Sequence, residues 1–328
     1  MARDEDLSIT AGQVVLAGTL TRPEPTGEAA ASPDHRWPAV LLLPSVLPRD
    51  RDGRFDAGRH HGWFAPEQAP AGGLLGRLAA ALAAHGVASL RVDKRGCGSS
   101  GGEWSTAGLF TLVDDARDAL STLRGHDTVD PTRIGLVGHG EGAWLALSVA
   151  AADPGIGPLT LVGAPARGLR DVLRRAAAER ARNRNGTSPE PRHPFVAAFD
   201  RGLEELIERA ERGEPEMTLT MAGGRPLTLG LAGWEQAMRI PTRALATLQR
   251  RSVTLLHGEA DEWFHPDESV LLAAALAASA APRRILVPSA GHDLVEAAPA
   301  LIGEVAADLA ARLQPRRLPT VLLSIGLR

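Results

Sequence analysis

The sequence contains very little of several chemically useful residue types. Its 328 residues include no tyrosine, a single cysteine (Cys97) and, among 36 basic residues, a single lysine (Lys94). Without tyrosine, no phenol can act as an acid, a base or an oxyanion donor. A single cysteine excludes a disulfide framework and any metal site built from several cysteines. These absences remove whole classes of mechanism before any motif is considered.

A large excess of charge and a long apolar run are also missing. The formal net charge is -3 and the pI is near 6.4, whereas a nucleic-acid-binding domain normally has a basic face. The first residues, 1–6, are acidic where a secretory signal would be basic and then apolar. No uncharged apolar stretch of about 18 residues follows. We therefore expect a cytoplasmic protein with neither a nucleic-acid nor a membrane partner.

Short apolar runs alternate with segments of helical spacing along most of the chain. The run 39–43 stops at Pro44 and has the composition of a strand that is buried on both faces. Strands separated by helices of this length predict a parallel sheet with helices on both faces. The expected elements are an antiparallel strand pair within 7–21, strands at 39–43, 87–92, 134–137, 159–162, 253–257 and 284–287, and helices at 74–85, 109–123, from about 141, 267–281 and 297–313.

The alternation breaks between Pro165 and Arg250. Arginine-rich and glutamate-rich helical segments occur there, together with a predicted hairpin of strands 217–221 and 226–229. The pattern of the α/β core then resumes. We therefore predict a core formed by residues 1–164 and 251–328, with residues 165–250 inserted into it.

One turn of the predicted core has the local context of a nucleophile elbow. The sequence Gly138-His139-Gly140-Glu141-Gly142 lies between a predicted strand and a predicted helix, as G-x-S-x-G does, but its central residue is Gly140 rather than serine. Further along the chain, Asp261 follows a predicted strand and His292 lies on a later loop. The order of elbow, acid and histidine is that of the α/β-hydrolases.

With these motifs, the chain resembles the α/β-hydrolases, and more narrowly the bacterial esterases and peptidase-like hydrolases that carry an inserted lid. Two further segments support the resemblance, 48–53 (PRDRDG) and 92–102 (VDKRGCGSSGG). The resemblance implies an α/β fold with a mainly parallel, eight-stranded sheet and a helical lid at residues 165–250. Four apolar residues of the lid are expected to form walls of the pocket: Phe195, Phe199, Trp234 and Met238.

The sequence departs from this family at two places. Gly140 replaces the elbow serine, and Pro44-Ser45 replaces the His-Gly that normally ends the third strand. Loss of a triad serine lowers turnover by about a million-fold, so ordinary esterase activity is not expected. A histidine oriented by a carboxylate can still act as a general base. We therefore predict a lyase in which His292 and Asp261 eliminate a carboxylate, such as acetate, from an acylated intermediate of bacterial natural-product biosynthesis.

Three other functions stay open at this point. They are a cofactor-independent oxygenase or cyclase, a ligand-binding pseudoenzyme, and a serine esterase inactivated by the replacement at Gly140. The expected ligand is a small apolar molecule, with no cofactor and no metal, and a homodimer is left open. The gap at Gly140 is expected to hold a substrate atom or a water molecule. The residues expected to bind the substrate are Gly140, Glu141, Ser45, Val46, Trp63 and Phe64.

Overall fold

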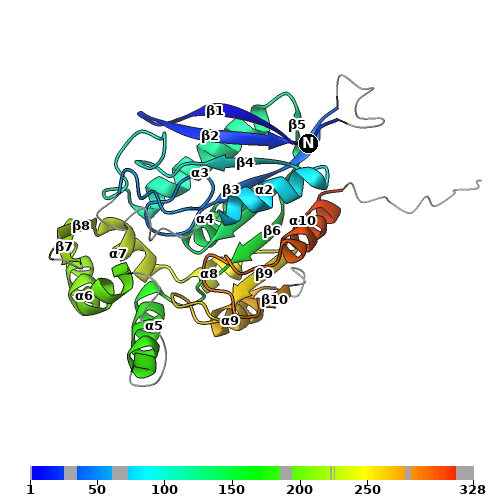
Figure 1. Ribbon diagram of the computed structural model, residues 1–328. Coiled ribbons are helices and arrows are strands. Elements are labelled where there is room, and N and C mark those ends of the chain that lie inside the picture. Colours follow the sequence, from blue (N-terminus) through cyan, green and yellow to red (C-terminus); the bar gives the residue numbers. More distant parts are fainter. Residues whose placement is uncertain are drawn as a thin grey trace, which may run out of the picture.

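An eight-stranded sheet forms the centre of the molecule (Figure 1). The computed structural model describes residues 2–25, 35–60, 73–184, 194–221, 224, 226–277 and 282–314. The strand order is β1-β2-β4-β3-β5-β6-β9-β10. The pairs β1/β2 and β2/β4 are antiparallel and every other pair is parallel, which confirms the predicted sheet. The strands are β1 (Arg3–Ala11), β2 (Val14–Arg22), β3 (Trp37–Leu43), β4 (Ala88–Val92), β5 (Val129–His139), β6 (Ile156–Val162), β9 (Val253–Gly258) and β10 (Arg283–Val287).

Helices cover both faces of this sheet, which explains why β4 and β9 are buried along their whole length. The helices α2 (Leu74–Ala84) and α10 (Pro299–Leu313) pack together on one face. On the other face lie α3 (Leu109–Gly125), α4 (Glu141–Ala152), α8 (Thr242–Ala246) and α9 (Asp267–Ala275). No helix in the described ranges is both long enough and apolar enough to cross a bilayer.

Helix α9 is shorter than the sequence predicts. The predicted helix 267–281 ends at Ala275, because Leu276 is extended (φ -68°, ψ 139°) and its side chain packs into the core. Similarly, α10 begins two residues late, at Pro299, because Ala298 is extended (ψ 142°) and a proline favours the first turn of a helix. Both differences concern element ends, where local sequence patterns are least informative.

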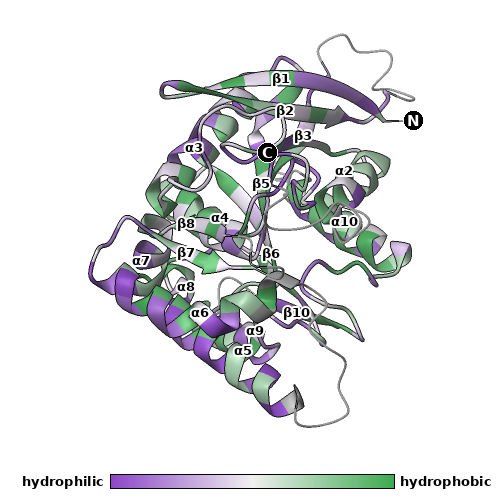
Figure 2. Cartoon of the chain, turned by 60° about the vertical axis from the view of Figure 1, so that its left-hand side comes forward, coloured by the Kyte–Doolittle hydropathy of each residue, from purple (hydrophilic) through white to green (hydrophobic). Residues whose placement is uncertain are grey.

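The segment between β6 and β9 packs as a second apolar cluster. It contains α5 (Leu169–Arg184), α6 (Pro194–Glu211), the antiparallel hairpin of β7 (Glu216–Thr220) and β8 (Pro226–Gly230), and α7 (Ala232–Arg239). The predicted hairpin is therefore confirmed. Its cluster also includes Leu47 and Phe55 from the loop after β3 and Trp263 and Phe264 from the loop after β9. Hydrophilic stretches run along α5 and α6 (Figure 2). The segment thus packs its apolar side against loops at one edge of the sheet.

That edge is where the parallel strands β3, β4, β5, β9 and β10 end. In an open α/β sheet, ligands bind outside the carboxyl ends of the strands, because the connecting loops meet there. The residues that the sequence singled out follow these strand ends in the chain: Ser45 after β3, Lys94 after β4, Gly140 after β5, Asp261 after β9 and His292 after β10.

Candidate active site

Asp261 and His292 form the hydrogen bond that the sequence predicts. His292 Nδ1 donates to Asp261 Oδ2 at 2.8 Å, and Asp261 Oδ1 accepts the backbone N–H groups of Trp263 (2.8 Å) and Phe264 (2.9 Å). Burial alone would raise the pKa of Asp261, but the adjacent His292 and His257 lower it below its ordinary value overall. The ionised carboxylate therefore keeps the proton of His292 on Nδ1 and leaves Nε2 as the basic nitrogen.

Besides Asp261, His139 and Gly163 contact His292 and restrict its orientation. His139 Nε2 donates to the His292 carbonyl at 2.9 Å, and the two rings stack with centroids 4.6 Å apart. Burial and the neighbouring His292 lower the pKa of His139 to about 3, so His139 is neutral at pH 7. A Cβ at Gly163 would lie 3.1 Å from the His292 ring, so only glycine lets the ring approach β6 this closely. His139 thus orients His292 and is no base itself.

Ser45 is the third member of this chain of hydrogen bonds. Its Oγ lies 2.9 Å from His292 Nε2, and its side chain is completely buried. Because Nε2 carries the free lone pair, the hydroxyl donates and the imidazole accepts. The sequence suggests Ser45 only as a pocket residue, because it lies on a different segment from the elbow. The signal that points to it is the pair of departures from the family: serine at 45 and glycine at 140.

Gly140 forms the turn between β5 and α4, in a conformation (φ 53°, ψ -112°) that is strained for other residues. A Cβ there would lie 2.1 Å from Ser45 Oγ and 2.9 Å from His292 Nε2. The predicted gap for a substrate atom or water is therefore wrong, since the Ser45 hydroxyl occupies it. Strands β3 and β5 are neighbours in the sheet, so the loops after them converge on the same space.

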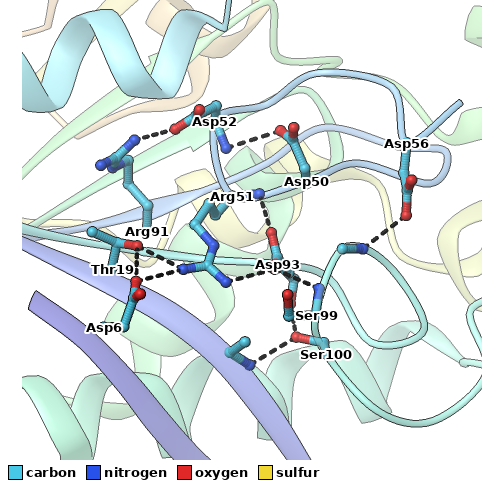
Figure 3. A network of polar contacts seen from close by, with 12 residues as sticks. Asp6, Thr19, Asp50, Arg51, Asp52, Asp56, Arg91, Asp93, Ser99 and Ser100 are labelled. Carbon is cyan, nitrogen blue, oxygen red and sulfur yellow. Dashed lines mark hydrogen bonds and ion pairs between the residues drawn. The ribbon is translucent and has the colours of Figure 1, made fainter. Parts of the chain in front are cut away.

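The two further segments that carry the resemblance, 48–53 and 92–102, contact each other through hydrogen bonds and an ion pair. Arg51 donates its backbone N–H to Asp93 Oδ1 (2.6 Å) and its guanidinium to Asp93 Oδ2 (2.8 Å). Asp93 also accepts the N–H of Ser99 (2.9 Å) (Figure 3). A second arginine, Arg49, pairs with Asp293 at 2.8 Å, next to His292. The loop that carries Ser45 is thus fastened to the end of β4 and to the histidine loop.

An apolar cavity lies between the strand ends and the inserted segment. Its lining includes Val46, which follows Ser45, and Phe264, whose ring contacts His292, but not the three residues themselves. Of the predicted substrate-binding residues, Val46 and Glu141 line it. The two charged residues of the lining are paired, Glu141 with Lys94 and Arg167 with Glu268. The remaining lining residues are Leu47, Leu109, Trp144, Pro165, Leu169, Leu173, Trp234, Ala237, Thr242, Trp263 and Phe264.

Only part of the predicted wall from the inserted segment lines this cavity. Trp234 does so, whereas Phe199 and Met238 are buried in the second apolar cluster behind it. Helical spacing shows which side of a helix is apolar, but not which apolar residue faces a cavity. The Phe195 side chain and both Trp63 and Phe64 lie outside the described residues. The sequence did not identify Trp144 and Trp263, whose large side chains give this cavity much of its wall.

Within the described ranges, one group of side chains has the composition of a metal site. Ligand atoms of Asp56, His60 and Cys97 lie within 4.8 Å of one another. Each already serves the loop: Asp56 accepts the N–H groups of Arg59 and Gly98, and His60 donates to the Gly96 carbonyl at 2.9 Å. Burial raises the pKa of Cys97 to about 12, so its thiol is protonated at pH 7. Ligation would require these loop contacts to break.

A comparison with protein families finds one whose model matches most of the chain. The family model described as "Alpha/beta hydrolase family" matches residues 59–305. An uncharacterised protein of Mycobacterium tuberculosis, Rv2307c, is 34% identical over 127 residues, which cover 34% of this chain and 44% of that protein. The chain therefore matches less than half the length of this curated relative.

Solved structures resemble the molecule over nearly its full length. Est1E from Butyrivibrio proteoclasticus, with ferulic acid bound, has a TM-score of 0.62 at 16% identity and covers 93% of this chain and 98% of its own. The alpha/beta hydrolase GrgF from Penicillium has a TM-score of 0.61 at 16% identity and covers 95% and 98%. At this level of identity the likeness concerns the fold alone.

Proposed function

Because the chain belongs to the alpha/beta hydrolase family, we propose that it is an acyl hydrolase whose nucleophile is Ser45, with His292 as general base and Asp261 as the residue that orients it. The proposal depends above all on one observation, the 2.9 Å contact between Ser45 Oγ and His292 Nε2. A serine, a histidine and a buried carboxylate in this geometry are the parts of a covalent acyl-transfer site. Such a site is identified by geometry and not by position in the sequence.

The two departures from the family compensate for each other in this proposal. The family carries its hydroxyl at the elbow and glycine at the end of the third strand, and this chain has the reverse. Since a Cβ at position 140 would lie 2.1 Å from Ser45 Oγ, Gly140 is what makes room for the hydroxyl of Ser45. Taken separately, each change suggests lost catalysis. Taken together, they keep one hydroxyl in contact with His292.

The proposed reaction uses only side chains of the described site. His292 Nε2 accepts the Ser45 proton as Ser45 Oγ bonds to the acyl carbon, and the imidazolium is stabilised by Asp261. The imidazolium then gives that proton to the departing alkoxide, which leaves as an alcohol. Water attacks the acyl-serine, with His292 again as base, and releases a carboxylic acid and free Ser45.

The start of α4 supplies donors for the negative charge that develops on the acyl oxygen. The helix begins at Glu141, and the first N–H groups of a helix have no acceptor within it. Because the Ala143 N–H already donates to the Gly140 carbonyl at 3.1 Å, the proposed donors are the N–H groups of Glu141 and Gly142. The helix dipole also favours a negative charge at this end. Each donor in an oxyanion hole contributes about a hundred to a thousand-fold in rate.

The cavity beside the site indicates the kind of substrate. Its walls are mostly aromatic and aliphatic, and both of its charged side chains are already paired with buried partners. Burying a further charge in this cavity would be unfavourable. We therefore propose an uncharged ester with an apolar acyl group, and residues 165–250 as the lid over it.

Elimination of a carboxylate is the second candidate, and the absence of a hydroxyl from the elbow favours it. In that reaction His292 would remove a proton from carbon and expel a carboxylate such as acetate from an acylated intermediate, without using Ser45. An oxygenase, a cyclase or a pseudoenzyme would likewise not use the Ser45 hydroxyl. The hydroxyl therefore separates hydrolysis from all of these alternatives.

The experiment is covalent labelling with a fluorophosphonate, followed by peptide mass spectrometry, alongside hydrolysis of short-chain nitrophenyl esters. We expect the adduct on Ser45 and a loss of ester turnover on the order of a million-fold in Ser45→Ala. The matched control is Ser89→Ala, because Ser89 on β4 is equally buried and its hydroxyl has no hydrogen-bond partner among the described residues. Ester turnover that persists in Ser45→Ala but is lost in His292→Ala would overturn Ser45 as the nucleophile and leave His292 as a base that acts without it, which is what the elimination requires.

A further inference from the structure

Lys94, the single lysine of the chain, lies directly behind the proposed nucleophile. It follows Asp93 at the end of β4, and its side chain is only 5% exposed. Its ammonium donates to the backbone carbonyl of Ser45 at 3.1 Å and to Glu141 Oε2 at 2.6 Å. One buried cation therefore connects the ends of β3 and β4 with the first residue of α4.

We propose that Lys94 is a positioning residue, which holds Ser45 in the orientation for attack and neutralises Glu141 beside the developing oxyanion. This inference rests on the proposed function, since it requires Ser45 to be the nucleophile. Lys94 contacts a backbone atom of Ser45 and not the reacting hydroxyl, so it acts through Ser45 and through charge.

The need for positioning follows from where Ser45 lies. An elbow serine is fixed by a strained turn between a strand and a helix, whereas Ser45 lies on a loop that leaves β3 through Pro44. Two contacts fix the residue: its hydroxyl bonds to His292 and its carbonyl accepts from Lys94. Without Lys94 the peptide between Ser45 and Val46 can rotate, and the hydroxyl loses its fixed direction toward Nε2.

The need for neutralisation follows from where Glu141 lies. Its backbone N–H belongs to the start of α4, which supplies the proposed oxyanion donors, and the residue also lines the apolar cavity. A free carboxylate there would repel the negative charge of the transition state, and more strongly in a dry cavity than in water. Pairing with Lys94 removes that repulsion while the N–H remains available.

The test compares the rate at which a fluorophosphonate labels Ser45 in four proteins: the wild type, Lys94→Met, Glu141→Gln and the double variant. Methionine keeps an unbranched apolar side chain but no donor and no charge. We expect Lys94→Met to lower the maximal labelling rate by at least about tenfold, as loss of a charge-assisted hydrogen bond would, with little change in probe affinity. The double variant should recover part of this loss, because it removes the unpaired carboxylate as well.

The matched control is Arg95→Met, since the neighbouring Arg95 makes a comparably buried ion pair with Asp115 but faces α3 instead of Ser45. It should lower the melting temperature without changing the labelling rate. Labelling at the wild-type rate in Lys94→Met would overturn the inference while leaving the proposed function intact. Should Lys94→Met fail to fold, a double variant that labels as fast as the wild type would overturn it equally. No labelling of Ser45 in the wild type overturns the proposed function, and this inference with it.

Discussion

At the scale of single residues, the geometry of the site depends on Ser45 and Gly140, which lie on two separate segments of the chain. Ser45 Oγ and a side chain at position 140 compete for the same space beside His292. A side chain at position 140 and the present position of the Ser45 hydroxyl therefore exclude each other. The glycine at position 140 has to be interpreted together with the serine at position 45.

This competition predicts a large energetic coupling between the two positions. Gly140→Ala should be strongly destabilising in the wild type, because its Cβ would clash with Ser45 Oγ and because φ is 53°. In a Ser45→Gly background the clash with Ser45 Oγ is gone, while the backbone strain and the close contact with His292 Nε2 remain, so the cost should fall by roughly 1–3 kcal/mol. Urea unfolding of the two single variants and the double variant measures this coupling. Additive costs would show that the two residues do not share this space.

Asp261→Asn should abolish most of the labelling of Ser45. The amide cannot stabilise the imidazolium and favours the wrong tautomer of His292, which costs on the order of ten-thousand-fold in a triad. The measurement is the rate of fluorophosphonate labelling at pH 7. Asp114→Asn is the control, because Asp114 is a surface residue that pairs only with Arg117 among its described contacts. If Asp261→Asn is labelled at a rate within about tenfold of the wild type, a loss of only about 1.4 kcal/mol, the proposed role of Asp261 is wrong.

At the scale of elements, the site depends on how closely helix α4 approaches the end of β3. A Cβ at Gly142 would lie 2.3 Å from the Leu43 carbonyl oxygen and 2.7 Å from that of Pro44. Glycine at this position therefore lets the first turn of α4 pack against the segment that leads into Ser45. Gly142 therefore helps to set the distance between the Ser45 hydroxyl and the start of α4.

Gly142→Ala should consequently separate α4 from β3 and lower both stability and labelling of Ser45. The clash is with backbone atoms, which cannot move aside as a flexible side chain can, so we expect a loss of about 1–3 kcal/mol in unfolding free energy. Gly303→Ala on α10 is the control, since a Cβ there would meet nothing within 4 Å. That substitution should stabilise the helix by about 0.5–1 kcal/mol and leave labelling unchanged. Equal effects of the two substitutions on labelling would contradict this account of the packing.

At the scale of the whole molecule, the sheet and the inserted segment enclose titratable groups that would otherwise be hydrated. His139, at the end of β5, and Asp261, in the loop after β9, are both buried. Different causes lower the pKa values of these two groups: burial lowers the pKa of His139 to about 3, whereas the histidine partners lower the pKa of Asp261 despite its burial. In both cases the folded state binds fewer protons than the unfolded state in acid.

The free energy of unfolding should therefore decrease as the pH is lowered, and this decrease should begin above the pH range in which carboxylates titrate. In the unfolded chain His139 gains a proton below about pH 6.5, whereas in the folded protein it stays neutral down to about 3. Between these values acid favours unfolding by about 1.4 kcal/mol per pH unit for this one group. Urea unfolding at several pH values should show a shallower dependence in His139→Gln than in the wild type. An equal slope in His139→Gln and in the wild type would contradict this role of the buried His139.

The sequence alone was sufficient for the fold and for half of the site. The alternation of apolar runs and helical segments predicted the sheet, and the resemblance to the α/β-hydrolases, through the order of elbow, acid and histidine, predicted the contact between Asp261 and His292. Only the tertiary structure showed that the Ser45 hydroxyl contacts His292 Nε2 and lies against Gly140. Ser45 and Gly140 lie on separate segments, and nothing in local sequence states that the loops after β3 and β5 converge within hydrogen-bond distance of one imidazole. That contact arises from strand order and from close packing at Gly140 and Gly142, which are properties of the folded sheet as a whole.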